Sequence, residues 1–303
     1  MIDFLKYRWI TTIISLSIIG GFLGTYVYRV MNNQEPLKFS VDFTGGTQVL
    51  FKFSKSVTSS ELLSILEKAG WPGAQARQFS ESEVLVRVKE TASDATGLAA
   101  KMKEAISKEI PGIDIQILQN ESVGQTIGAD LRWKATLAIL LALLAMLMYI
   151  VLRFRSFSFA LGAVVALFHD AIAILAVFMA FGLEISPNVI MAILAILGYS
   201  INDTIVIFTQ IRKNLRKMHS SSIYEIVNTS INQMLRRTLL TSISTGLTVT
   251  ALLIIGGETL RNLSIALLVG IIFGTYSSIY IASMIMTLFY RKKDKEHKET
   301  AKA

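Results

Sequence analysis

The sequence predicts a polytopic α-helical membrane protein with six transmembrane helices and one ferredoxin-like α+β domain. Hydrophobic residues make up 52% of the 303 residues and charged residues only 17%, against about 25% charged residues in a soluble domain. Apolar segments of roughly 20 residues, long enough to cross a bilayer, occur at 9–30, 134–152, 157–182, 187–209, 238–256 and 263–290. A long polar stretch, 31–133, separates the first two of them.

The first apolar segment reads as an uncleaved membrane helix. It is too long for the apolar core of a secretory signal, and no A-x-A cleavage site follows it. We therefore expect residues 1–30 to form a short terminus and the first helix. Residues 134–290 are expected to form a five-helix membrane region.

Basic residues lie just beyond the ends of the apolar segments and predict the topology. Lys and Arg are frequent in 153–156, 210–237 and 291–303, whereas the short loops on the opposite side contain one arginine, Arg261. Cytoplasmic loops carry the excess of Lys and Arg, so we predict a cytoplasmic N-terminus and a basic cytoplasmic tail, 291–303. The net charge of +8 is then a feature of topology, and we predict no nucleic-acid binding.

The outer stretch, 31–133, changes its hydrophobic period several times. Four parts alternate like strands: 47–53, 74–79, 84–88 and 113–118. Two parts have the period of a helix: 58–69 and 94–109. Thr58, with Glu61 three residues later, has the spacing of a capping box. The order βαββαβ predicts a ferredoxin-like domain, and we expect it to be a binding or mechanical module.

Residue content excludes several kinds of functional site. The chain has no cysteine, which excludes disulfides and thiolate metal sites. Its histidines are scattered without metal-ligand spacing: His169, His219 and His297. Neither a nucleophile–base set nor a nucleotide-binding loop is evident. We therefore predict that the protein is not an enzyme and has no catalytic residues, no metal site and no cofactor.

Two further patterns concern helix placement. Apolar residues of 218–236 fall on roughly one helical face, which predicts a helix along the cytoplasmic interface ahead of the fifth span. Small residues mark expected close helix approaches. They are Gly20 and Gly24 in the first helix, and Gly270, Gly274 and Ser278 in the last.

Two aspartates lie within apolar helices. Asp203 is 16 residues from Pro187, about 24 Å along a helix, and so falls in the cytoplasmic third of the bilayer. Asp170 lies near the midplane, about midway between Arg155 and Glu184. An aspartate facing lipid costs about 2.5–3.5 kcal/mol even on lenient scales, so both need a structural or functional explanation.

The sequence leaves two roles open for these acids. They can be structural acids that accept hydrogen bonds from hydroxyls, such as those of Thr241, Thr245 and Thr248 on the fifth helix. They can instead be proton-relay residues, because burial disfavours the carboxylate and a nearby cation favours it. The relay role is favoured for Asp203, and the two roles are about even for Asp170.

The sequence also does not decide which residues interact with the two acids. His169 is about 100° around the helix from Asp170, so the two are not an obvious dyad. Arg237 is either a snorkelling residue at the membrane interface or the counter-ion of Asp203. Arg236 is the alternative candidate for the counter-ion.

The segment 42–47, Asp42-Phe43-Thr44-Gly45-Gly46-Thr47, resembles a known motif. It is similar to the DFTGG box of the SecF members of the SecD/SecF family of bacterial protein translocase subunits, in the resistance-nodulation-division superfamily. Gly124 and Gly128, Tyr149 to Phe154 and His169-Asp170 are further matches. The run 198–206, which reads GYSINDTIV and begins at Gly198, matches best, and Arg237-Thr238-Leu239 follows downstream. The motifs keep the family's order from residue 42 to about 280.

The resemblance implies a function in protein export. Members of this kind act with SecD and associate with the SecYEG channel in the bacterial inner membrane. They use the proton gradient to promote export of unfolded preproteins after the step driven by SecA, and YajC and YidC are further implied partners. The domain 31–133 would be periplasmic, and the coupling ion would be the proton.

The resemblance also assigns roles by motif position. Asp203 matches the essential membrane aspartate of the family and Arg237 the basic residue that works with it, while Asn202 tunes Asp203 and Asp170 is a further candidate for the relay. The motif residues with expected structural roles are Asp42, Gly45, Gly46, Gly124, Gly128 and Gly198. Thr204 replaces a common serine, and 207–210 (IFTQ) replaces the commoner VSDR, which removes an acid and a base.

Two other functions remain as alternatives. One is a scaffold subunit of a translocon or insertase complex that moves no protons. The other is a small-molecule exporter of the same superfamily. Such exporters typically have twelve spans and two outer domains, and this chain is predicted to have half of each.

Overall fold

The computed structural model describes residues 1–89, 95–218 and 220–290. It divides into two compact units, one made of Met1–Lys38 with the chain from Leu137 onward, the other of Phe39–Thr136. We call them the helical unit and the α+β unit. The boundaries predicted from the sequence for the polar domain, 31 and 133, lie near the observed limits of the α+β unit. The predicted basic tail, 291–303, and His219 lie outside the described residues.

The α+β unit contains a four-stranded antiparallel sheet and two main helices. Its elements are β2 (Gly46–Phe53), α3 (Ser59–Lys68), β3 (Gln75–Gln78), β4 (Glu83–Val88), α4 (Ala95–Glu109) and β5 (Ile115–Val123). The strand order β3-β4-β2-β5 puts the first and third of these strands at the centre of the sheet. Together with the chain order βαββαβ, this confirms the predicted ferredoxin-like topology.

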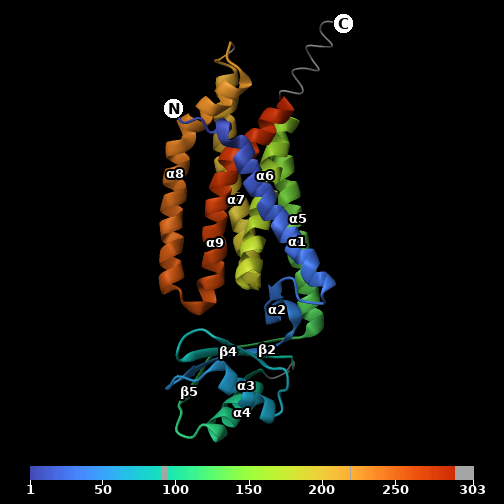
Figure 1. Cartoon of the computed structure of the whole chain (residues 1–303), viewed down its shortest axis with the longest axis vertical. Helices are drawn as coiled ribbons and strands as arrows, with labels where there is room; N and C mark the ends of the chain where they lie inside the picture. Colours follow the sequence, from blue (N-terminus) through green and yellow to red (C-terminus); the bar gives the residue numbers. More distant parts are fainter. Residues whose placement is uncertain (90–94, 219, 291–303) are drawn as a thin grey trace. The chain divides into compact units, whose positions relative to one another are not determined.

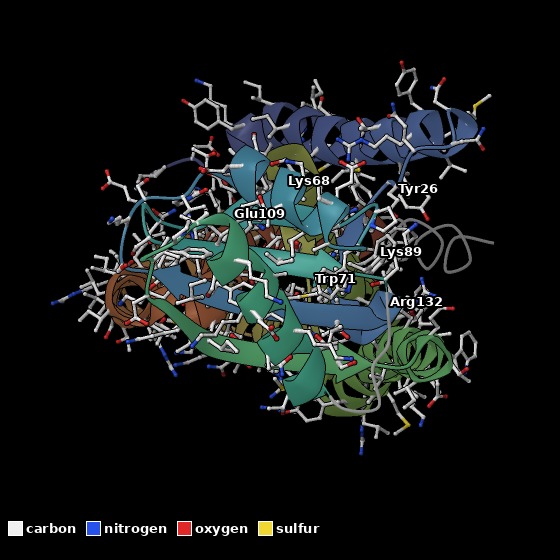
Figure 2. All side chains as sticks on the ribbon, turned by 90° about the horizontal axis from the view of Figure 1, so that it is seen from below. Tyr26, Lys68, Trp71, Lys89, Glu109 and Arg132 are labelled. Atoms are coloured by element: carbon white, nitrogen blue, oxygen red, sulfur yellow. The ribbon has the colours of Figure 1, made fainter. Side chains whose placement is uncertain are left out.

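Helices α3 and α4 lie over the same face of this sheet (Figures 1 and 2). Every second residue of β2, at Val49, Phe51 and Phe53, is buried in the core beneath them, as the period of two in a strand requires. Thr58 caps α3 by accepting a hydrogen bond from the backbone N–H of Glu61. Of the predicted capping box, only this hydrogen bond is present in the described residues.

The helical unit is a bundle of long helices (Figure 1). Its helices are α1 (Arg8–Met31), α5 (Gln125–Phe154, whose first turns belong to the α+β unit), α6 (Phe157–Phe181), α7 (Pro187–Leu215), α8 (Ile223–Ile255) and α9 (Gly257–Ser277). A π-helical turn, η2 (Ser278–Ala282), continues α9, and the apolar helix reaches Tyr290. Within the described ranges six helices are long and apolar enough to cross a membrane, which confirms the six predicted spans.

Short elements complete the described chain. They are the 3₁₀ turn η1 (Leu5–Tyr7), the strands β1 (Lys38–Phe39) and β6 (Glu184–Ile185), and the helix α2 (Val41–Thr44).

The helix predicted ahead of the fifth span is continuous with that span. A single helix, α8, runs from Ile223 to Ile255, because no proline interrupts it and its only glycine is Gly246. Its 33 residues extend about 50 Å, well beyond the hydrocarbon thickness of about 30 Å. The excess lies at its start, where Ser222 and Glu225 form a capping box.

The start of α8 holds the N-terminus of the chain. The side chain of Asn228 accepts a hydrogen bond from the backbone N–H of Phe4 and donates one to the carbonyl of Ile2. Tyr224 donates to the carboxylate of Asp3. Residue 1 and the start of α8 therefore lie at the same end of the bundle, as the alternation of six spans requires.

Helices α6, α7 and α9 form the core of the bundle. About half of the apolar window of each is buried, against less than a fifth for α1, α5 and α8. A Cβ built on Gly270 would lie 2.5 Å from Cγ1 of Ile196, which confirms the predicted close approach on α9. The prediction for Gly20 and Gly24 is wrong within this chain, because a Cβ on either meets no described atom within 4 Å.

Candidate functional site

The glycines of the 42–47 motif lie where β2 begins beside the start of α5. Gly45 and Gly46 adopt positive φ angles of 77° and 120°, which non-glycine residues rarely adopt. A Cβ on Gly45 would come within 2.7 Å of the Cα of Gln125, and one on Gly128 within 2.9 Å of the carbonyl of Phe43. These glycines therefore have a structural role, in that they let two backbone segments touch.

The rest of this motif supports the same turn. Asp42 accepts a hydrogen bond of 2.8 Å from the hydroxyl of Ser40, the N-cap residue of α2. Gly124 meets only a side-chain carbon of Ile127, at 3.9 Å, so its contribution to the packing is small. Gly198, on α7, is exposed and its missing Cβ faces open space, so nothing in this chain explains its place in the motif.

Asp170 lies at the centre of the α6–α7–α9 core and is completely buried. Its Oδ2 accepts hydrogen bonds from the hydroxyl of Ser200 on α7 at 2.6 Å and from that of Ser277 on α9 at 2.9 Å. Its Oδ1 lies 3.3 Å from Nδ1 of His169. Three helices therefore meet at one carboxyl group.

The expectation that His169 and Asp170 form no dyad is wrong. Although adjacent residues point about 100° apart on a helix, both side chains turn toward each other in the core. The imidazole packs against Phe273 and Tyr276, and its buried Nε2 has no hydrogen-bond partner in the described structure. Tyr276 in turn donates to the carbonyl of Thr11 on α1. The histidine thus joins the acid to the aromatic packing of α9.

Asp203 has a different setting on α7. It is buried, with 6% of its surface exposed. The hydroxyl of Ser242 on α8 lies 3.5 Å from its Oδ2, and this is the only side-chain hydrogen bond of Asp203 in the described part of the chain. The hydroxyl of Thr275 on α9 lies 2.7 Å from that of Ser242. Asp203 therefore lies where α7, α8 and α9 meet.

The two candidate cations and Asn202 lie outside the packed core. Arg236 and Arg237 are both exposed on α8, and of the two it is Arg237 whose charge acts on Asp203. Among the described residues no ion pair joins Arg237 to Asp203. Asn202 is also exposed, on the side of α7 away from the core, so the structure does not bring it together with Asp203 as the sequence predicts.

Hydroxyl groups do contact both acids, but different ones from those predicted. The hydroxyls of Thr241, Thr245 and Thr248 donate to carbonyls of their own helix. This back-bonding is common for threonine in apolar helices. The hydroxyls that contact the acids belong to Ser200, Ser242 and Ser277, and no sequence pattern distinguishes these serines from the other hydroxyl residues of α7, α8 and α9.

Helix α9 carries hydroxyls toward both acids within one turn. Thr275 contacts Ser242, Ser277 donates to Asp170, and Ser278 pairs with Thr204 at 2.8 Å. Ser278 begins the π-helical turn η2, a local widening that is frequent at functional sites. The residue Thr204, where a serine is common, therefore makes a hydroxyl contact that a serine can also make.

The departure at 207–210 has a visible consequence. The side-chain amide of Gln210 donates to the amide oxygens of Gln233 and Asn214, and Asn214 donates to Ser230. The end of α7 and the start of α8 are thus joined through neutral groups. No group of three or more His, Cys, Asp or Glu residues suited to a metal ion occurs among the residues that the structure describes.

The two acids have chemistry suited to protons. Neither belongs to a metal-ligand cluster among the described residues, and each contacts at least one hydroxyl, a group that can donate or accept. Of the two, Asp203 has the weaker hydrogen bonding among the described residues.

Comparisons with known proteins agree with this arrangement. The family described as "Protein export membrane protein SecD/SecF, C-terminal" matches residues 102–292, and the "SecD/SecF GG Motif" matches 35–57. A Protein translocase subunit SecF from Pseudomonas aeruginosa is 37% identical over 94% of this chain and 90% of its own. One from Thermodesulfovibrio yellowstonii is 35% identical over 95% and 94%.

A fused relative and its solved structure extend the comparison. Protein translocase subunit SecDF from Thermus thermophilus is 36% identical over 88% of this chain, which spans 36% of that protein. The crystal structure of SecDF from the same organism, described as a translocon-associated membrane protein, matches with a TM-score of 0.84 and 34% identity, covering 96% of this chain and 39% of the other.

The relatives are named as translocase subunits, and the family models, the membrane helices and the fold point the same way. The chain belongs to the SecD/SecF family of protein export membrane proteins.

Proposed function

We propose that this chain uses the proton motive force, together with a SecD-type partner, to promote export of unfolded preproteins through a SecYEG-type channel after the SecA-driven step. Asp203 is the residue that takes up and releases the proton, and Arg237 tunes it. YajC and YidC are further candidate partners. No cofactor is needed beyond the coupling ion, which we propose to be the proton.

The observation that carries this proposal is the incomplete hydrogen bonding of a buried membrane acid. Asp203 lies within a helix long and apolar enough to span a membrane, and its one hydroxyl partner in the described chain is 3.5 Å away. An ionisable residue inside a membrane is expensive and usually functional. The nearby charge of Arg237 supplies an interaction that changes when Asp203 gains or loses its proton.

The energy available is sufficient for mechanical work on the α+β unit. One charge that crosses the membrane potential is worth about 2.3 kcal/mol per 100 mV. A difference of that size biases two arrangements by more than tenfold. We propose that the α+β unit, on the periplasmic side, moves between two arrangements as the proton passes. The N- and C-termini are then cytoplasmic.

The need for a partner follows from the fused relative. This chain spans 39% of the SecDF chain whose structure it matches, and that protein's name joins D and F parts. We propose that a separate SecD-type subunit supplies the remainder here, and that it covers the exposed face of α7 that carries Asn202 and Gly198.

The test is Asp203→Asn in vesicles that contain the chain, its SecD-type partner and the channel. The neutral amide keeps the size of the side chain, so we expect assembly to persist and gradient-stimulated export to fall by about tenfold or more. Asp114→Asn, at an exposed acid of the α+β unit, is the matched control and should leave export unchanged. Undiminished gradient-dependent export with Asp203→Asn would exclude the relay, and loss of assembly would favour a scaffold.

A further inference from the structure

A groove runs along the outside of the bundle between α1 and α6. Its volume is about 360 Å³. On α1 the residues that line it extend from Ser17 to Arg29, a stretch that corresponds to about 18 Å along the helix. One leaflet of the hydrocarbon core of a membrane is about 15 Å thick, half of the whole. The groove is therefore about as long as one leaflet is deep.

The groove exists because small residues of the two helices face each other without touching. They recur on both walls, at Ser17, Gly21 and Thr25 on α1 and at Ala173, Ala176 and Ala180 on α6. A Cβ on Gly21 would meet no described atom within 4 Å, whereas one on Gly270 would lie 2.5 Å from a side chain of α7. At the edge of the groove Phe22 packs against Ile172 and Met179. This contact fixes α1 on α6, so the space is a lasting feature of the helix pair.

The width of the groove fits one hydrocarbon chain. A volume of about 360 Å³, spread over about 18 Å of helix, gives a mean width of about 5 Å. A polymethylene chain has this width, because its carbon atoms approach their neighbours to about 4 Å. A helix with its side chains is about 10–12 Å across, so a membrane span of another subunit is too wide to enter. The groove therefore fits an acyl chain of a lipid.

Two cations of the helical unit lie at one end of the groove. Arg29 lines it and donates from Nη1 to the carbonyl of Pro36 at 3.2 Å, which leaves the other N–H groups of its guanidinium for a ligand. Lys38 follows Pro36 by two residues, and its Nζ would lie 3.2 Å from a Cβ on Gly182, at the end of α6. Within the described ranges neither cation forms an ion pair. The groove therefore ends at two positive charges that come from different segments.

The polar groups at this end are available to a ligand. The hydroxyl of Thr25, one turn from Arg29, has no hydrogen-bond partner in the described part of the chain, whereas other threonines of the bundle donate to carbonyls of their own helix. The end of α6 is closed by its backbone, since the N–H groups of Gly182 and Leu183 both donate to the carbonyl of Phe178. Neither cation is therefore needed there as a helix cap.

We propose that this groove binds one phospholipid, with an acyl chain between α1 and α6 and the phosphate between Arg29 and Lys38. Basic pockets between membrane helices bind anionic headgroups, and arginine and lysine both bind phosphate. The hydroxyl of Thr25 is placed to donate to an ester oxygen of the lipid. Residue 1 lies at the other end of the bundle, so the lipid belongs to the leaflet opposite the N-terminus, which is periplasmic in the proposed topology. The site goes beyond proton-coupled export and does not rest on it.

Native mass spectrometry of the full chain with its SecD-type partner tests the headgroup contacts. The complex should bind dioleoyl phosphatidylglycerol about tenfold more tightly than dioleoylglycerol, which has the same chains and no phosphate, and an excess of inorganic phosphate should not displace it. Arg29→Gln with Lys38→Gln should weaken phosphatidylglycerol binding about tenfold. Arg132→Gln, which removes an exposed cation of α5, is the control and should not change it. Equal binding of the two lipids, displacement by free phosphate or an equal loss in the control overturns the proposal.

A filling substitution tests the place of the acyl chain. Gly21→Leu puts a large side chain into the groove. Gly20→Leu is the matched control, because its Cβ also meets open space but does not line the groove. In vesicles that contain the complex, the immobilised fraction of spin-labelled phosphatidylglycerol should fall by one bound lipid with Gly21→Leu and stay unchanged with Gly20→Leu. Equal fractions for the two variants, including a groove covered by the partner, overturn the lipid site. Export by Asp203→Asn tests the proton relay separately, so either proposal can fail alone.

Discussion

The surroundings of Asp170 and Asp203 differ although the two acids lie in one helical bundle. Asp170 is fully buried and has three side-chain contacts, with Ser200, Ser277 and His169. Asp203 has one, at 3.5 Å, and lies near an arginine. The two carboxyl groups therefore differ in how completely they are hydrogen-bonded within the described part of the chain.

The difference indicates how one bundle can contain a fixed acid and a working acid. A carboxyl that binds three helices through short hydrogen bonds stabilises their packing, and a change in its protonation state would disturb all three. A carboxyl with one long hydrogen bond and an accessible hydroxyl pair can exchange its proton with little rearrangement. We therefore propose that Asp170 is chiefly a structural acid and that Asp203 exchanges the proton, and the predictions below test that division.

The largest expected effect on stability is at Asp170. Asp170→Ala leaves the hydroxyl of Ser200 without its acceptor and that of Ser277 with only the carbonyl of Gly274, so we expect a loss of about 1–3 kcal/mol in the free energy of unfolding. Asp203→Ala should cost no more than about 1 kcal/mol, because it removes one long hydrogen bond. Equilibrium unfolding in detergent measures both. Asp170→Asn keeps an acceptor oxygen and should recover part of the loss, and equal losses at the two acids would contradict the division.

A second pair of substitutions compares the glycines beside the acids. A Cβ on Gly274 would lie 3.0 Å from Cβ of Ser200 and 3.6 Å from Oδ2 of Asp170, so Gly274→Val should overpack the core at a cost of about 1–3 kcal/mol. Gly246→Ala meets open space and should be neutral or stabilise by up to about 1 kcal/mol, because alanine favours the helix. Thermal unfolding of the purified protein reports the sign of each change. A destabilising Gly246→Ala would mean that this space is filled.

Deletion of a single hydroxyl should separate stability from transport. Ser277→Ala removes a hydrogen bond of 2.9 Å to a buried carboxyl, and we expect a loss of about 1 kcal/mol in stability with export reduced only in proportion to the folded protein. Ser242→Ala should leave stability within about 0.5 kcal/mol and reduce export at normal protein levels. Paired unfolding and export assays decide. The reverse pattern would exchange the roles of the two acids.

The sequence predicts much of the fold because its signals are local. Apolar length predicts the six spans, and alternation predicts the four strands of the α+β unit. The apolar face of 218–236 predicts an amphipathic helix there, but it does not specify where α8 begins and ends. Whether Gly20 or Gly270 lies at a close approach depends on which helix faces it, and that is not a local property.

The candidate site is predictable only in part for the same reason. The sequence identifies Asp170 and Asp203 as candidate site residues because a carboxyl group in an apolar membrane helix has a high free-energy cost, whichever way its side chain points. Their hydroxyl partners lie 30 to 107 positions away in the chain, and only the packing of α6, α7, α8 and α9 selects Ser242 over Thr241. The dyad of His169 and Asp170 depends on rotamers, which helical spacing does not specify.

The smallest expected effect is at Asn202, which the sequence places in the relay and the structure places on the exposed side of α7. Asn202→Ala should change stability by less than about 0.5 kcal/mol, as for other surface sites, and export by little more than about twofold, the rate equivalent of that energy. Export from vesicles and unfolding in detergent measure the two effects, with Asn202→Gln as the polar control. If Asn202→Ala reduces export as strongly as Asp203→Asn while stability is unchanged, then Asn202 acts on the proton path through the partner subunit. In that case the exposed face of α7 that carries Asn202 also contributes to the proton path.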